Sequence, residues 1–197
     1  GDESFDRETD AVHEDVAHLK QIDFPIDDVQ ALLVTHCHID HVGRIPYLLA
    51  AGFTGPIYAT KATALLLPLV IEDAIKVGVT RNRSIIRSVM KRFQSQLVAI
   101  DYNQWFDVEG FAVDGSSSAL KAKFKVAGHI IGSAYIEFDV RSKNEKKRVV
   151  FSGDLGAPYS PLLPAPKSPY RCDELVIEST YGDRNHESRH NRRKVLQ

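Results

Sequence analysis

The sequence predicts a layered α/β fold, and two observations carry this prediction. Helical periodicity dominates the first half of the 197 residues, whereas strands with alternating apolar and polar residues dominate the second half. Polar residues suited to chemistry follow several of the predicted strands, which is typical of layered α/β proteins. The chain is long enough for one domain with a sizeable core.

The first half is predicted to be mainly helical. Its predicted elements are a helix at 5–19, a strand at 29–35, a helix at 41–51, a strand at 56–60 and helices at 61–77 and 84–100. Pro25 follows the first helix, and Gly52 is placed to end the second.

The second half is predicted to form a meander of strands. The predicted strands cover 120–126, 134–140, 148–152 and 175–178. In the first of them Lys121, Lys123 and Lys125 alternate with apolar residues, so we expect a strand with one solvated face. Residues 142–147 are expected to form a hairpin connection. Five of the nine prolines fall at 156–170, which predicts a stiff, extended loop.

Composition excludes some partners and says little about others. The net charge is -1, with 43% apolar and 26% charged residues, so any nucleic acid must be recognised by a local patch. The longest apolar stretch, 62–71, contains Pro68 and is too short to span a bilayer, so no membrane partner is expected. Two cysteines make no disulfide framework, which favours a reducing, cytoplasmic location.

The segment that follows the strand at 29–35 has the composition of a metal site. It contains His36, His38, Asp40 and His41, and imidazole and carboxylate ligands suit a divalent ion such as zinc. In an extended segment His36 and His38 share a face and can bind one ion together. Asp40 and His41 follow the bend, where they can reach a second ion. Cys37 points the opposite way and is not expected to be a ligand.

Two further ligand candidates lie on glycine-flanked turns after strands. His129 stands in Gly-His-Ile-Ile-Gly, and Asp154 stands in Ser-Gly-Asp-Leu-Gly directly after the strand at 148–152. Glycine lets the backbone approach an ion closely. A carboxylate at position 154 can bridge two ions, with one oxygen toward each.

These three motifs, in this order, resemble the metallo-β-lactamase fold. The resemblance covers residues 28–186 and implies an αββα sandwich, of which this chain is expected to be a part. It implies that His36, His38 and His129 hold one zinc ion. Asp40 and His41 would hold a second, with Asp154 bridging the two.

The run Glu-Ser-Thr-Tyr-Gly-Asp-Arg-Asn-His at 178–186 resembles a motif of the β-CASP branch of that fold. This branch contains RNA-processing nucleases, such as the cleavage and polyadenylation endonuclease subunit and its bacterial homologues. The resemblance implies a zinc-dependent phosphodiester hydrolase that acts on RNA as an endonuclease or a 5′-exonuclease. It implies catalytic roles for Glu178 and Asp40, the latter by orienting a water or accepting its proton.

The same resemblance predicts that the chain is shortened at both ends. Residues 1–197 would be a metallo-β-lactamase segment that lacks the first strands, with a β-CASP domain expected after about residue 190. Two histidines would lie in the missing part, so we expect the second zinc site to be incomplete in this segment. His186 and His190 are less suited to replace them, because both fall in a polar helix start.

RNA contacts are predicted at a basic stripe. Arg83, Arg87 and Lys91 recur every four residues on the helix at 84–100, although a solvated helix face is an alternative. His186 is a further candidate contact. The side chains of Tyr102, Trp105 and Phe106 could stack on bases, but core packing explains them better.

Two other functions remain open at this point. A small-molecule ester or thioester hydrolase can use the same fold. A non-catalytic scaffold is a second alternative, and it is disfavoured because all six expected ligands are present. Besides RNA, a second copy of the chain is a candidate partner.

Overall fold

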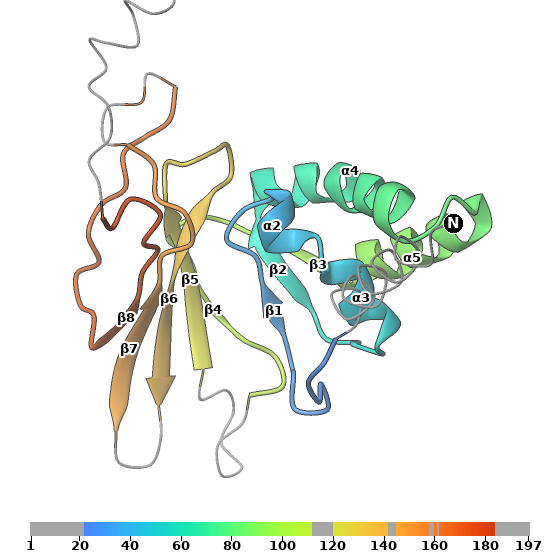
Figure 1. Ribbon diagram of the computed structural model, residues 1–197. Helices are drawn as coiled ribbons and strands as arrows, with labels where there is room; N and C mark the ends of the chain where they lie inside the picture. Colours follow the sequence, from blue (N-terminus) through green and yellow to red (C-terminus); the bar gives the residue numbers. More distant parts are fainter. Residues whose placement is uncertain (1–21, 112–119, 142–144, 158–159, 161, 184–197) are drawn as a thin grey trace, which may run out of the picture.

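In the computed structural model, two β-sheets pack face to face and helices cover the outer face of one of them (Figure 1). The structure describes residues 22–111, 120–141, 145–157, 160 and 162–183. The helix predicted at 5–19 lies outside these residues. The described part is therefore an α/β/β sandwich, in agreement with the layered prediction. None of its helices combines the length and apolar character needed to cross a membrane.

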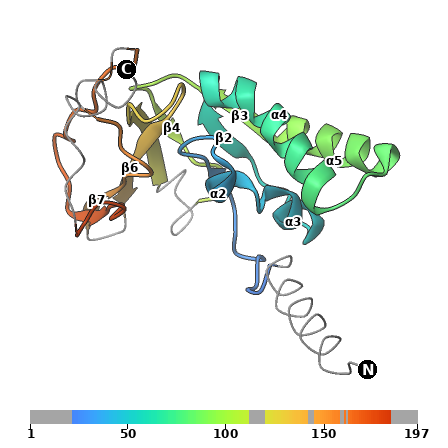
Figure 2. The same ribbon diagram turned by 45° about the horizontal axis from the view of Figure 1, so that its top comes forward.

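The first sheet contains three parallel strands. In order across the sheet they are β1 (Leu32–Leu33), β2 (Ile57–Thr60) and β3 (Leu97–Ile100). Helices form the crossover connections that parallel strands require: α2 (Ile39–Val42) and α3 (Ile45–Ala50), then α4 (Lys61–Gly78) and α5 (Arg83–Gln96). Figure 2 shows the same helices on one side of this sheet. Leu67, Ile71 and Phe93, all fully buried, fill the space between the helices and the sheet.

The second sheet contains five strands in chain order. They are β4 (Trp105–Asp107), β5 (Leu120–Val126), β6 (Ala134–Arg141), β7 (Lys146–Phe151) and β8 (Glu174–Val176). Neighbours are antiparallel up to β7, and β8 runs parallel to β7. Between the sheets, the Tyr58 ring of β2 lies 4.9 Å from the Phe106 ring, which stacks 5.7 Å from that of Phe124. These apolar contacts hold the two sheets together.

Two predictions in the first half placed too much regular structure around the metal motif. The expected strand at 29–35 is reduced to β1. On the N-terminal side Pro56 has no N–H with which β2 could extend the pairing, and on the C-terminal side the Thr35 carbonyl accepts from Ala134 of the second sheet. The expected helix at 41–51 is divided into α2 and α3. Pro46 explains the division, since its nitrogen cannot donate to the Val42 carbonyl.

The predicted helix at 84–100 was too long. It ends at Gln96, and residues 97–100 form β3, which pairs in parallel with β2. A short apolar run fits a helix or a strand by pattern alone, and the free edge of β2 decides for the strand. Strand β4 was not predicted. Tyr102 and Phe106 pack in the core as expected, but the Trp105 ring is covered by the cationic groups of Lys123 and Arg148, which lie 4.4 and 4.6 Å from its centroid.

Candidate metal centre

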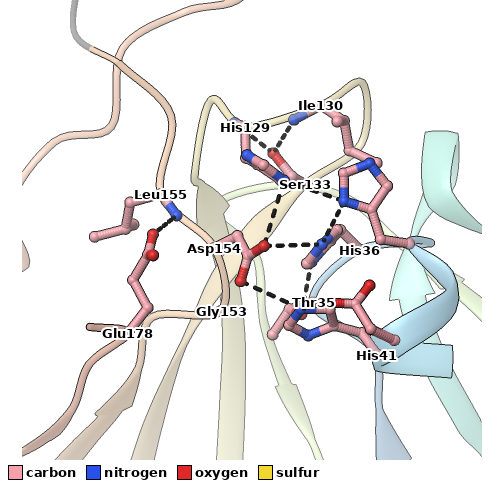
Figure 3. A network of polar contacts seen from close by, with 12 residues as sticks. Thr35, His36, His41, His129, Ile130, Ser133, Gly153, Asp154, Leu155 and Glu178 are labelled. Atoms are coloured by element: carbon pink, nitrogen blue, oxygen red, sulfur yellow. Dashed lines mark hydrogen bonds and ion pairs between the residues drawn. The ribbon is translucent and has the colours of Figure 1, made fainter. Parts of the chain in front are cut away.

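Three loops from both sheets meet at one end of the sandwich (Figure 3). One loop follows β1, one joins β5 to β6, and one follows β7. The Ala134 N–H donates to the Thr35 carbonyl at 2.8 Å, which ties β6 to the end of β1. The Gly156 N–H donates to the Ala127 carbonyl at 2.8 Å, which ties the third loop to the second. The backbone therefore brings His36, His129 and Asp154 together.

Four side chains form a compact donor set. His36, His38, His129 and Asp154 each offer one atom, and these atoms lie within 4.8 Å of one another. His38 Nδ1 lies 3.2 Å from His36 Nε2 and 3.1 Å from His129 Nε2. Asp154 Oδ2 lies 3.7 Å from His36 Nε2 and 3.4 Å from His129 Nε2.

Four of the six spacings in this donor set are close to the edge of a tetrahedron around zinc, and the other two are no longer than 4.8 Å. With metal–ligand bonds of about 2.0–2.1 Å, neighbouring ligand atoms of a regular tetrahedron lie roughly 3.3 Å apart. The four measured separations, from 3.1 to 3.7 Å, bracket that value. The chemistry also agrees, since three imidazole nitrogens and one carboxylate oxygen are donors that a divalent transition metal accepts. The residues present therefore fit a metal ion.

His36 is held in the protonation state that a ligand needs. It is fully buried, and burial together with the neighbouring His41 lowers its pKa from 6.5 to about 4, despite the opposing effect of Asp154. The ring is therefore neutral at physiological pH. Its Nδ1 lies 3.1 Å from Thr35 Oγ1, so an Nδ1–H can donate there and leave the lone pair of Nε2 free.

Asp154 also reaches the second pair of predicted ligands. Its Oδ1 lies 3.2 Å from His41 Nε2, while Oδ2 faces the first donor set. Asp40 Oδ2 lies 3.4 Å from the same His41 nitrogen, and the Asp40 side chain is 73% exposed. The two oxygens of one carboxylate thus face two neighbouring groups of donors. This is the geometry that a bridging ligand requires.

The turn that carries His129 is fixed by hydroxyl groups. Ser133 Oγ accepts hydrogen bonds from the N–H groups of His129 and Ile130 at 3.0 and 3.2 Å. The Gly132 carbonyl accepts from the hydroxyls of Thr60 and Thr63 at 2.7 and 2.9 Å, which links the turn to the start of α4. The sequence did not predict a role for these hydroxyl groups. Only Ser133 gave a local signal, as a serine four residues after the candidate ligand.

Two glycines allow the Asp154 loop to lie close to its neighbours. Gly153 has a φ of 51°, in the left-handed region that favours glycine. A Cβ on Gly156 would overlap the carbonyl oxygen of Gly128, so only glycine fits where the third loop passes the second. These glycines therefore let the loops approach one another closely, whereas the prediction concerned approach of the backbone to an ion.

Glu178 lies behind the Asp154 loop. Its Oε1 accepts a hydrogen bond from the Leu155 N–H at 2.6 Å, and its own N–H donates to Ser152 Oγ at 3.0 Å. Burial by itself would raise the pKa of the carboxyl group. The hydrogen bonds from Leu155 and Thr180, with a smaller effect of His129, outweigh burial and hold that pKa below its usual value. Glu178 is thus an anion that holds the backbone next to Asp154.

Other predicted residues lie apart from this centre. Arg83, Arg87 and Lys91 line a separate groove between α4 and α5. His186 lies outside the described residues. Cys37 is buried in the core beneath the site, as expected for a side chain that points away from the ligands, and burial raises the pKa of its thiol.

Two facing sheets with a histidine- and aspartate-lined centre at their shared end define a metal-binding α/β protein. The chain belongs to the metallo-beta-lactamase superfamily, because the model of that family matches residues 1–191. The sequence-based resemblance to this fold is confirmed.

Several characterised proteins are similar to the chain. Ribonuclease TTHA0252 of Thermus thermophilus is 37% identical over 83% of the chain and 34% of its own length. Transcription termination factor FttA of Cenarchaeum symbiosum is 33% identical over 80% of the chain and 23% of its own length. Endoribonuclease ysh-1 of Neurospora crassa is 29% identical over 88% of the chain and 20% of its own length. The chain thus spans between a fifth and about a third of the length of these relatives.

Proposed function

We propose that the chain provides the metal centre of a zinc-dependent phosphodiester hydrolase that cleaves RNA, within the β-CASP branch of the superfamily. The observation that carries the proposal is the donor set of three histidines and Asp154, whose spacing fits zinc. RNA as the substrate class is supported by similarity to proteins named as ribonucleases. The motif that begins at Glu178 supports the same branch.

We assign two zinc ions to this centre. His36, His38 and His129 would hold the first ion, Asp40 and His41 would contribute to the second, and Asp154 would bridge them. The bridging assignment is supported by the opposite directions of the two Asp154 oxygens. Only Asp40, His41 and Asp154 serve the second ion among these residues, so we expect this segment to bind it more weakly than the first.

The chemistry follows from these assignments. Bound zinc would lower the pKa of a water from about 15.7 to near 7 and offer positive charge to a phosphate oxygen. Asp40, largely exposed beside His41, can accept the proton of an attacking water at Oδ2. Glu178 keeps the Asp154 carboxylate in place through the Leu155 N–H, so the ligand geometry is preorganised.

We place this activity in a longer chain. The β-CASP domain expected after about residue 190 and a homodimer remain predictions. The resemblance to the β-CASP branch further implies products with a 5′-phosphate and a 3′-hydroxyl, which are likewise a prediction. A reducing, cytoplasmic location is supported by the free thiols of Cys37 and Cys172.

The metal content of the purified protein tests whether the three histidines and Asp154 bind zinc. The protein, purified after exposure to zinc, should retain one tightly bound zinc per chain by mass spectrometry and take up a second more weakly. Asp154→Asn should weaken both sites, since one carboxylate serves both. Asp101→Asn is the matched control, because Asp101 pairs with Lys61 on the surface and its loss should not alter zinc content. Equal zinc binding by the two variants would contradict the assignment.

Cleavage of a labelled single-stranded RNA by the protein in its full reading frame tests the substrate class. Activity should disappear with chelator and return with zinc. Hydrolysis of esters or thioesters without RNA cleavage would favour the small-molecule alternative. Zinc-loaded protein that cleaves neither substrate would favour a scaffold.

A further inference from the structure

A groove of about 540 Å³ lies between α4 and α5, lined by eight side chains and away from the metal centre. Its floor is formed by the buried side chains of Ile86 and Met90. Four of the lining residues are cations, Lys76 on α4 and Arg83, Arg87 and Lys91 on α5. The basic stripe that the sequence predicts therefore lines a groove rather than a convex surface.

The charge of this groove is mostly uncompensated. Its one carboxylate, Glu72, is engaged by Lys76 at 2.7 Å. Among the described residues, no carboxylate lies within ion-pair distance of Arg83, Arg87 or Lys91, all of which are exposed. Within the described part of the chain, three cations without an ion-pair partner thus line one side of a concave surface.

The stability of α5 does not explain this arrangement. Cations four residues apart on a helix repel one another. Arg83 is also the first residue of α5, at the positive end of the helix dipole, and the first turn contains no acidic residue. Each of these placements disfavours the folded helix. An anion bound in the groove would attract the three cations and the positive end of the helix, and it would thereby offset these unfavourable interactions.

We propose that this groove binds the phosphate backbone of single-stranded RNA that extends from the metal centre, an inference that rests on the proposed function. Helix α4 connects the two places. Thr63 in its first turn holds the turn of His129 through the Gly132 carbonyl, and Glu72 lies nine residues further, about 13 Å along the helix axis. An RNA strand of several nucleotides is needed to occupy both sites.

The lining also indicates how the strand is recognised. None of the described residues that line the groove is aromatic, so bases have no ring on which to stack. Arginine and lysine bind phosphate without reading sequence. The groove therefore contributes affinity that is independent of sequence. An acidic protein segment is the competing occupant, and the test includes it.

The experiment measures binding of a fluorescent 20-nucleotide single-stranded RNA by anisotropy at several salt concentrations. The test variant is Arg83→Gln/Arg87→Gln/Lys91→Gln. Each phosphate contact on a single strand contributes about 0.7 to the slope of log affinity against log salt, so the triple variant should lose about 2 from that slope. Between 50 and 200 mM salt, the affinity of the unmodified protein should fall roughly 20-fold more than that of the variant.

Two further variants control for net charge and for folding. Lys121→Gln/Lys147→Gln/Lys167→Gln removes the same charge from on or beside the second sheet and should keep the slope. Arg83→Lys/Arg87→Lys keeps the groove basic and should also keep it. We call the Arg83/Arg87/Lys91 variant the groove triple and the Lys121/Lys147/Lys167 variant the control triple. The proposal is overturned if the control triple weakens RNA binding as much as the groove triple does, or if the groove triple leaves the salt dependence of RNA affinity unchanged.

Two other probes separate the outcomes. Hydrolysis of bis(4-nitrophenyl) phosphate, too small to reach the groove, should be unchanged in the groove triple. If the groove triple loses RNA affinity while the unmodified protein cleaves no RNA, the groove assignment is supported and the proposed function fails. Polyglutamate that binds the groove more tightly than RNA does would assign it to an acidic protein segment and overturn the proposal.

Discussion

Replacing Glu178 with alanine should loosen the metal centre without removing any ligand. The Glu178 carboxylate accepts the Leu155 N–H at 2.6 Å, one residue from Asp154. A hydrogen bond to a charged group contributes about 1.5–3 kcal/mol, and we take the lower value because the carboxylate is only partly buried. For a domain of this size, a loss of about 1.5 kcal/mol lowers the melting temperature by roughly 3–6 °C.

The larger effect should be on metal affinity. Groups that orient a ligand typically change metal affinity by 10- to 100-fold when they are removed, and Glu178 orients the backbone of Asp154. Competition with a chromogenic chelator measures zinc affinity, and calorimetry of the metal-free protein measures the melting temperature. Glu174→Ala is the control, because Glu174 lies on the exposed strand β8 and Lys147 is the only described partner of its side chain.

The result distinguishes two roles for Glu178. A residue that acts only in the chemical step would leave zinc affinity unchanged in Glu178→Ala while the cleavage rate falls. A positioning residue would lower zinc affinity, and saturating zinc would restore part of the rate. Zinc affinity within twofold of the unmodified protein would refute the positioning role.

Three further outcomes follow from the structure. Burial, with a smaller effect of Glu137, raises the pKa of Tyr135 to about 12. Unfolded tyrosine ionises near pH 10, so the stability that this group contributes is complete below pH 10 and is lost as the pH rises to about 12, roughly 3 kcal/mol in all. Urea unfolding at a series of pH values should show that loss of stability, and Tyr135→Phe should remove it. If the free energy of unfolding changed with pH equally in both proteins, the raised pKa of Tyr135 would be contradicted. Gly156→Ala would place a methyl group on the Gly128 carbonyl, so zinc affinity and melting temperature should both fall, and a normal zinc titration would exclude that close approach. Phe124 is fully buried between the sheets, so Phe124→Ala should lower the free energy of unfolding by about 3–5 kcal/mol. Urea denaturation measures this change, and a loss below 1 kcal/mol would show that the sheets do not depend on this contact.

The sequence predicts those features of the site that depend on residues close to one another in the chain. His36, His38, Asp40 and His41 fall within six positions, so their number and residue types alone indicate a metal site. The predicted opposite orientation of Cys37 is confirmed because alternation of side chains is also a local property. The β-strands of the second half were located well for the same reason, since alternation is visible within each strand.

The remaining features depend on contacts between distant segments. Nothing near Thr60 or Thr63 in the sequence indicates that their hydroxyls hold a carbonyl about 70 residues away. The run at 97–100 is a strand only because β2 offers it an edge. Lys123 looked solvated by alternation, yet its side chain is only 16% exposed, because Glu137 and Trp105 cover it. Partners of this kind cannot be deduced from periodicity.

The metal centre lies where the two sheets are joined, and this position has an energetic consequence. His36, His38 and His41 follow β1 of the first sheet, whereas His129 and Asp154 belong to loops of the second. The Ala134–Thr35 hydrogen bond crosses the same junction. An ion bound by both groups therefore joins the sheets, and it stabilises the folded state by an amount that grows with the logarithm of its concentration above Kd. By the same linkage, any change that separates the sheets weakens metal binding even when every ligand is intact. Mutations in the core between the sheets should thus lower zinc affinity, whereas mutations of the outer face of α5 should not.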